Sequence, residues 1–88
     1  MPKTRAEGDR LATSAEVVAL ARFRRAQNVR IAWLAVRYGM RVGWVNEALR
    51  GLKPLTRSEV RTLRAHIANL AGEALVAAKA PKDPNGEP

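Results

Sequence analysis

Basic side chains dominate the middle of this 88-residue chain, where Arg and Lys outnumber Asp and Glu by eleven to two between positions 22 and 64. The basic residues are Arg22, Arg24, Arg25, Arg30, Arg37, Arg41, Arg50, Lys53, Arg57, Arg61 and Arg64. Folding this window into one small body creates a surface that attracts polyanions, and guanidinium groups bind phosphates and the edge of guanine. The composition therefore predicts a nucleic-acid partner. An acidic protein, a membrane surface or a solvated charge excess are the alternatives.

Few residues are suited to catalysis or metal binding. The chain has no cysteine, and His66 is its single histidine, so no thiolate and no set of imidazole ligands is available. No nucleophile and base stand in a recognisable arrangement, and no glycine-rich phosphate loop occurs. We expect no enzyme activity, cofactor, metal or small-molecule substrate. The absent cysteines, the lack of a membrane-length apolar run and the polar start "MPKTRAEGDR" predict a cytoplasmic protein without a membrane partner.

Two short patterns predict where the outer helices begin. "TSAE" at 13–16 and "TRSE" at 56–59 have capping-box spacing, in which Thr accepts from an amide three residues on and Glu returns a hydrogen bond. The first helix should reach about Ala26 and stop at "QN". The second should reach Lys79, with Gly72 as a weak point for a kink or break. Its apolar stripe consists of Val60, Leu63, Ile67, Leu70, Ala74 and Ala77.

Between these helices, two glycines divide the sequence into two short helices. Residues 30–38, "RIAWLAVRY", are followed by Gly39, and residues 41–50, "RVGWVNEALR", are followed by Gly51. Glycine adopts the left-handed conformation that closes a helix without a clash of Cβ. No alternating strand pattern occurs. We therefore predict an all-α domain over 13–79, a flexible arm at 1–12 and a disordered, proline-rich tail at 80–88.

The segment "RIAWLAVRYGMRVGWVNEALRG" resembles the helix-turn-helix of the phage repressor and Cro superfamily. The matching positions are Leu34, Ala35, Gly39, Met40 and Val45, with "AL" at 48–49. The following "GLKPLTRSEVRTLRAHI" is similar to that family's loop, proline and capped fourth helix. The resemblance covers about residues 14–70. It implies a small four- to five-helix lambda-repressor-like domain, here with a long C-terminal helix, that binds operator DNA as a dimer. The departures from the family pattern are Ile31, Trp33, Gly43 and Trp44.

The helix at 41–50 is the expected reading element, because a helix of this size fits the major groove of DNA. The residues expected to face bases are Arg41, Val42, Gly43, Asn46, Glu47 and Arg50. Arg pairs with guanine and Asn with adenine, while Glu47 accepts from cytosine or orients a neighbouring Arg. A solvated helix face is the alternative. Gly43 either allows close approach to DNA or relieves crowding beside Trp44, which itself either braces the fourth helix or contacts a partner.

Residues at the helix ends are expected to hold the DNA backbone, since phosphate contacts fix the register of a reading helix. They are Asn28, Arg30, Lys53 and Arg57. The arginines of the first helix either extend this basic surface or are solvated; they are Arg22, Arg24 and Arg25.

The end of the long helix is predicted to form a homodimer, because two copies about 34 Å apart read a palindrome. The expected interface residues are Leu70, Ala74, Leu75 and Ala78, unless this end frays or folds back. The chain is thus predicted to be a transcriptional repressor of phage or mobile-element origin. One rival is an architectural or recombination-directing DNA-binding protein. The other is a small inhibitor of a host or regulatory protein, which exposed Trp33 and Trp44 would favour.

Overall fold

The computed structural model describes residues 10–79, in which all regular structure is helical apart from one isolated backbone bridge. The helices are α1 (Ser14–Ala26), α2 (Ile31–Arg37), α3 (Val42–Leu49) and α4 (Arg57–Lys79). The prediction of an all-α domain is therefore confirmed. The predicted tail at 80–88 and most of the predicted arm, residues 1–9, lie outside the described residues.

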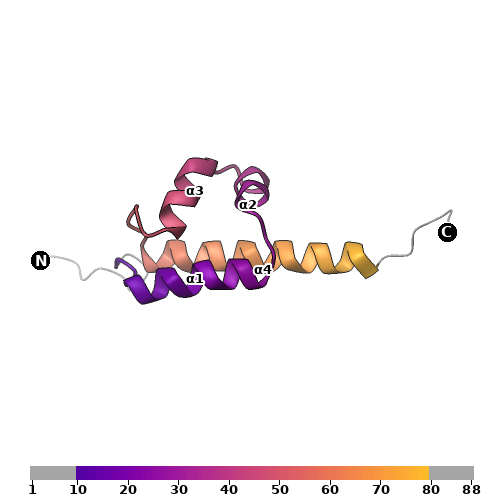
Figure 1. Ribbon diagram of the computed structural model, residues 1–88, viewed down its shortest axis with the longest axis horizontal. Helices are drawn as coiled ribbons and strands as arrows, with labels where there is room; N and C mark the ends of the chain where they lie inside the picture. The colour runs from indigo at the N-terminus through magenta and orange to yellow at the C-terminus, as the bar shows by residue number, and fades with distance from the viewer. Residues whose placement is uncertain (1–9, 80–88) are drawn as a thin grey trace, which may run out of the picture.

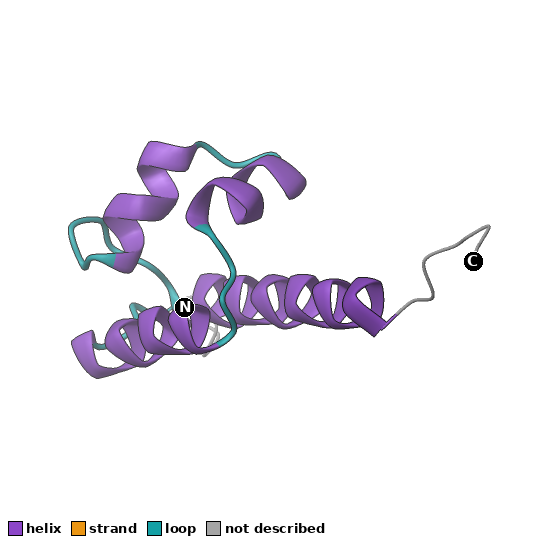
Figure 2. Ribbon diagram, turned by 45° about the vertical axis from the view of Figure 1, so that its right-hand side comes forward, coloured by secondary structure: helices purple, strands orange, loops and turns teal. Residues whose placement is uncertain are grey.

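Helices α1 and α4 lie side by side and run in the same direction, while α2 and α3 lie together on one side of this pair (Figure 1). Figure 2 shows the same arrangement from another angle. The buried side chains between the helices form one core, made of Val17, Leu20, Val29, Leu34, Ala35, Val45, Ala48, Leu49, Leu55, Leu63, Ile67 and Leu70. The last turns of α4 extend past the other helices (Figure 1). This helix continues through Gly72, so the predicted break there is absent.

Leu70 is completely buried inside its own chain. The prediction that placed it at an interface between copies is therefore wrong, because the core continues one turn further along α4 than expected. The other members of that predicted interface, Ala74, Leu75 and Ala78, are exposed.

Both predicted capping boxes are present. At the start of α1, Thr13 Oγ1 accepts from the Glu16 amide at 3.2 Å, and Glu16 Oε1 accepts from the Thr13 amide at 2.7 Å. At α4, Thr56 and Glu59 repeat the exchange at 3.1 and 2.8 Å. Oε2 of Glu16 also lies 3.3 Å from Nε of Arg57, so one carboxylate joins the beginnings of both long helices.

The segment before α1 is attached at the same end of the molecule. The Ala12 amide donates to the Leu55 carbonyl and the Arg57 amide donates to the Arg10 carbonyl, both at 2.8 Å. Leu11 and Thr56 form the isolated antiparallel bridge. The prediction of a loose arm is thus wrong for residues 10–12, because their backbone groups find partners in the segment that leads into α4.

The first three helices end in the same way, each followed by a residue with positive φ. These residues are Asn28 (60°), Gly39 (68°) and Gly51 (80°). After each of them, an amide donates to the carbonyl five residues earlier, as Met40 does to Ala35 at 2.7 Å. This Schellman pattern satisfies helix-end carbonyls and reverses the chain within a few residues. The predicted stops at "QN", Gly39 and Gly51 are confirmed.

The shared carboxylate of Glu16 makes the stability of this end depend on pH. The backbone hydrogen bond from Thr13, together with the charge of Arg57, lowers the pKa of Glu16. A carboxyl group with a lowered folded-state pKa adds stability above its unfolded-state pKa, and that stability is lost as the pH falls through the folded-state value.

We therefore expect Glu16→Gln to lower the melting temperature near neutral pH, with the difference from wild type shrinking between about pH 5 and pH 3. Thermal unfolding followed by circular dichroism measures both. A difference that stays constant over this range would contradict a role for the Glu16 charge.

Candidate nucleic-acid interface

Buried residues fix α3 against α2 and the core. Leu34 and Ala35 of α2 and Val45 and Ala48 of α3 are completely buried. In a helix, residues three and four apart share a face, so these contacts occupy one side of α3. The opposite side, with positions 43, 46, 47 and 50, faces away from the core.

Two contacts from α4 hold the end of α2, immediately before the turn into α3. The ring of Tyr38 stacks on the ring of His66, with centroids 3.6 Å apart and planes inclined by 10°. Arg37 Nη2 donates to Glu73 Oε2 at 2.8 Å, and its guanidinium lies 5.5 Å from the Tyr38 ring centre. Sequence reasoning missed both contacts, because the partners are far apart in the chain and no local pattern joins them.

The six predicted base-reading residues differ in exposure. The exposed ones are Arg41, Val42, Gly43 and Arg50, and the half-buried ones are Asn46 and Glu47. Glu47 Oε1 lies 3.8 Å from Lys53 Nζ, with both side chains about half exposed. The carboxylate that was expected to face cytosine or orient an arginine therefore lies beside a lysine. A solvated pair of this kind is weak and leaves both groups accessible to another partner.

No contact from outside α3 requires a glycine at position 43. Apart from its chain neighbours Val42 and Trp44 and the backbone of its own helix, a Cβ added there would meet no atom within 4 Å. Both interpretations of Gly43, close approach to DNA and relief of crowding beside its neighbour Trp44, therefore stay predictions. Trp44 is half-buried and packs against the core, whereas Trp33 is 37% exposed. The predicted roles of Trp44, as a brace on the fourth helix or as a partner contact, both stay predictions.

The predicted phosphate-binding residues also divide into two groups. Arg30 precedes α2 and Lys53 follows α3, and both are exposed. Asn28 is exposed as well, but it is also the left-handed residue that ends α1. Arg57 is half-buried and pairs with Glu16, so it supports the fold, while its phosphate contact stays a prediction.

Among the arginines of α1, one supports the fold and two are exposed. Arg24 Nη1 donates to the Val29 carbonyl at 2.7 Å and thereby holds the turn between α1 and α2. Burial lowers the pKa of the Arg24 guanidinium, and the positive charge of Arg25 adds to this effect. Arg22 and Arg25 are exposed, which the basic-surface and the solvated interpretations both require.

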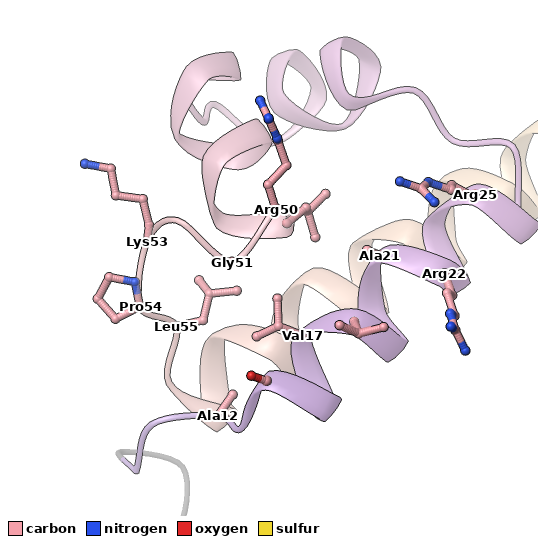
Figure 3. A pocket seen from close by; sticks show the side chains of 13 residues that line it. Ala12, Val17, Ala21, Arg22, Arg25, Arg50, Gly51, Lys53, Pro54 and Leu55 are labelled. Atoms are coloured by element: carbon pink, nitrogen blue, oxygen red, sulfur yellow. The ribbon is translucent and has the colours of Figure 1, made fainter.

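Arg22 and Arg25 line a groove of about 600 Å³ together with Arg50 and Lys53 (Figure 3). This groove, called the α1 groove below, lies between α1 and the 49–55 segment that joins α3 to α4. Sequence reasoning did not bring these four cations together, because the contact between α1 and α3 is tertiary. Arg25 also lines a second depression of about 510 Å³, together with Arg30. Because Arg25 belongs to both depressions, the exposed cations form a continuous surface from the end of α3 to the start of α2.

Comparison of the chain with protein-family models, with curated proteins and with solved structures gave no match. No helix within residues 10–79 is both long and apolar enough to cross a membrane. Over the same residues, no three carboxylate or imidazole groups gather in a way that would hold a metal ion. The geometry and charge of the surface are therefore the basis for inferring a function.

The open space around Gly43 leads to a test of its role. Gly43→Ala should raise the free energy of unfolding by up to about 1 kcal/mol, because alanine favours helix and the new methyl group meets no atom from outside its own helix. The same change at Gly39, where φ is 68°, should destabilise by about 1–2 kcal/mol. Thermal or urea unfolding of both variants measures the two changes in the free energy of unfolding, which should have opposite signs.

If Gly43 serves close approach to DNA, the stabilised Gly43→Ala variant should bind duplex DNA more weakly than wild type. Unchanged binding by this variant would show that the methyl group meets no partner there.

Proposed function

We propose that this chain is a sequence-specific regulator that binds double-stranded DNA, with α2, the turn at Gly39 and α3 acting as a helix-turn-helix. The observation that carries the proposal is the tight turn followed by an α3 secured from behind by buried Val45 and Ala48. Its opposite face is thereby free to enter a groove. A helix about 10–12 Å wide matches the major groove of B-DNA, which is about 12 Å wide.

The distribution of charge supports the same proposal. Exposed cations flank α3 on both sides, with Arg30 at the start of α2 and Arg50 and Lys53 after α3. Glu47 is the single carboxylate between residues 28 and 55, and it lies beside Lys53. Cations on both sides of a reading helix bind the phosphates on both sides of the major groove, which fixes its register and makes affinity depend on salt.

The proposal includes a homodimer formed by the end of α4. Ala74 and Ala78 follow buried Leu70 at steps of four residues, and Leu75 beside them is 56% exposed. Small side chains let two helices approach closely, and a dimer with two reading helices suits a palindromic operator. Occupancy of that operator would block transcription, which makes the chain a cytoplasmic repressor of the kind found in phages and mobile elements.

Base reading is tested with Arg41→Ala and Asn46→Ala. A duplex is first selected from a random pool by the wild-type chain, and affinities are then measured by fluorescence anisotropy. Each substitution should weaken binding to the selected duplex by about 1–3 kcal/mol, because each removes hydrogen bonds to a base edge. Affinity for a scrambled duplex should change little with Asn46→Ala, which removes no charge.

Arg61→Ala is the matched control, because Arg61 is an exposed arginine on α4, away from the reading helix. It removes the same charge as Arg41→Ala. If Arg41→Ala and Arg61→Ala lost equal affinity for the selected duplex, Arg41 would contribute only its positive charge and would not contact a base. Failure of any sequence to be enriched from the pool would overturn the proposed function.

Dimer formation is tested with Leu75→Glu. Sedimentation velocity should show a monomer at concentrations where the wild type is a dimer, and helix content should be unchanged because the replaced side chain is already exposed. Asn69→Glu adds the same charge at an exposed position earlier on α4 and should leave the dimer intact. A monomeric wild type would contradict the interface.

A further inference from the structure

The α1 groove combines an apolar floor with a cationic rim. The floor is formed by Val17, Val18, Ala21, Leu49 and Leu55. The four cations, Arg22, Arg25, Arg50 and Lys53, extend outward around these side chains (Figure 3). No carboxylate from residues 10–79 lines the groove. Both properties are needed to identify its occupant, since a cationic surface alone attracts any polyanion.

One face of α1 forms a wall of this groove along most of the helix. The α1 positions that line it are 14, 17, 18, 21, 22 and 25, which is the spacing of a single helical face. They extend over about 17 Å at 1.5 Å per residue. Val18 is 48% exposed on this face, although it is apolar and belongs to a core helix. The face is thus long enough for about three turns of a second helix.

We propose that the α1 groove docks an acidic amphipathic helix of a partner protein. Helices that bind in grooves insert apolar residues spaced three and four apart, which the floor of Val17, Val18 and Ala21 accommodates. Carboxylates on the flanks of the same helix would meet Arg22 and Arg25 on one edge and Arg50 and Lys53 on the other. Charge complementarity of this kind gives specificity and speeds association.

Two other occupants fit the groove less well. A second copy of this chain would bring a net charge of +8 toward four cations. A DNA duplex offers phosphates to the rim, but its convex backbone has no apolar group to place against Val17 and Val18. The acidic helix uses both the floor and the rim.

Docking has a consequence for the function proposed above. Arg50 and Lys53 belong both to the rim of the groove and to the surface proposed to face DNA. A helix seated in the groove would therefore compete with DNA for these two side chains. This competition rests on the proposed function. Docking of the helix is measured without DNA, so its test is independent of the test of DNA binding.

The docking test is a nuclear magnetic resonance titration of the ¹⁵N-labelled full chain with a synthetic peptide of Leu and Glu. The peptide has its leucines on one helical face. We expect amide shifts to gather in α1 and in residues 49–55. A peptide of the same composition with its leucines spread around the helix, and one with Gln in place of Glu, should each bind at least about tenfold more weakly.

Substitutions in the groove separate specific docking from general attraction. Val18→Glu and Arg22→Glu should each weaken peptide binding at least about tenfold, whereas Arg61→Glu, with the same charge change on α4, should alter it less than about threefold. Both replaced groove side chains are exposed, and the spectra of the variants report whether the fold is kept.

Three results would overturn the proposal. The first is the absence of peptide binding, and the second is equal binding of the peptide with spread leucines. The third is a loss of DNA affinity with Val18→Glu and Arg22→Glu while neither affects the peptide, because the groove would then belong to the DNA interface.

Discussion

The left-handed residue after each of the first three helices is the constraint on which the arrangement depends. Helices as short as α2 and α3, with 7 and 8 residues, are not stable alone in water and need tertiary contacts. Closure at Asn28, Gly39 and Gly51 reverses the chain quickly enough for both to return their apolar sides to the same core. A longer connection at Gly39 would separate α3 from α2 and would leave the direction of its exposed face undetermined.

The high positive charge is divided between the fold and the surface. Arg24 holds the turn after α1, Arg37 pairs with Glu73, Arg57 pairs with Glu16, and Arg64 lies 4.2 Å above the ring of Phe23. Of these four, Arg37 and Arg64 are themselves exposed, as are the other seven cations of the 22–64 window: Arg22, Arg25, Arg30, Arg41, Arg50, Lys53 and Arg61. Net charge alone therefore overestimates the surface available to a partner. Five of these other seven cations line the α1 groove or the second depression, which share Arg25, and this concentrates the electrostatic field on one part of the molecule.

The features that sequence predicted correctly are those whose partners are neighbours in the chain. A capping box joins two residues that are three apart in the chain, and a left-handed glycine closes the helix that directly precedes this glycine. Both motifs can therefore be recognised in a short segment. The features that it missed join distant residues. The burial of Leu70, the attachment of residues 10–12 to 55–57, the stack of Tyr38 on His66 and the gathering of Arg22 with Arg50 all follow from packing of whole helices. The base-reading and phosphate-binding roles stay predictions, because they depend on a partner.

Gly43 connects stability with function more directly than any charged residue. The caps, the closing residues and the core all agree locally with the fold, as is usual for a sequence that specifies one structure. Gly43 does not: it lies in α3 with ordinary backbone geometry, a Cβ there would meet no atom from outside its own helix, and glycine lowers helix stability relative to alanine. A residue that lowers stability, and that no tertiary contact requires, is typical of a functional surface. Because it stands beside exposed Arg41 and Val42, the beginning of α3 is the part of the molecule where close contact with a partner is expected.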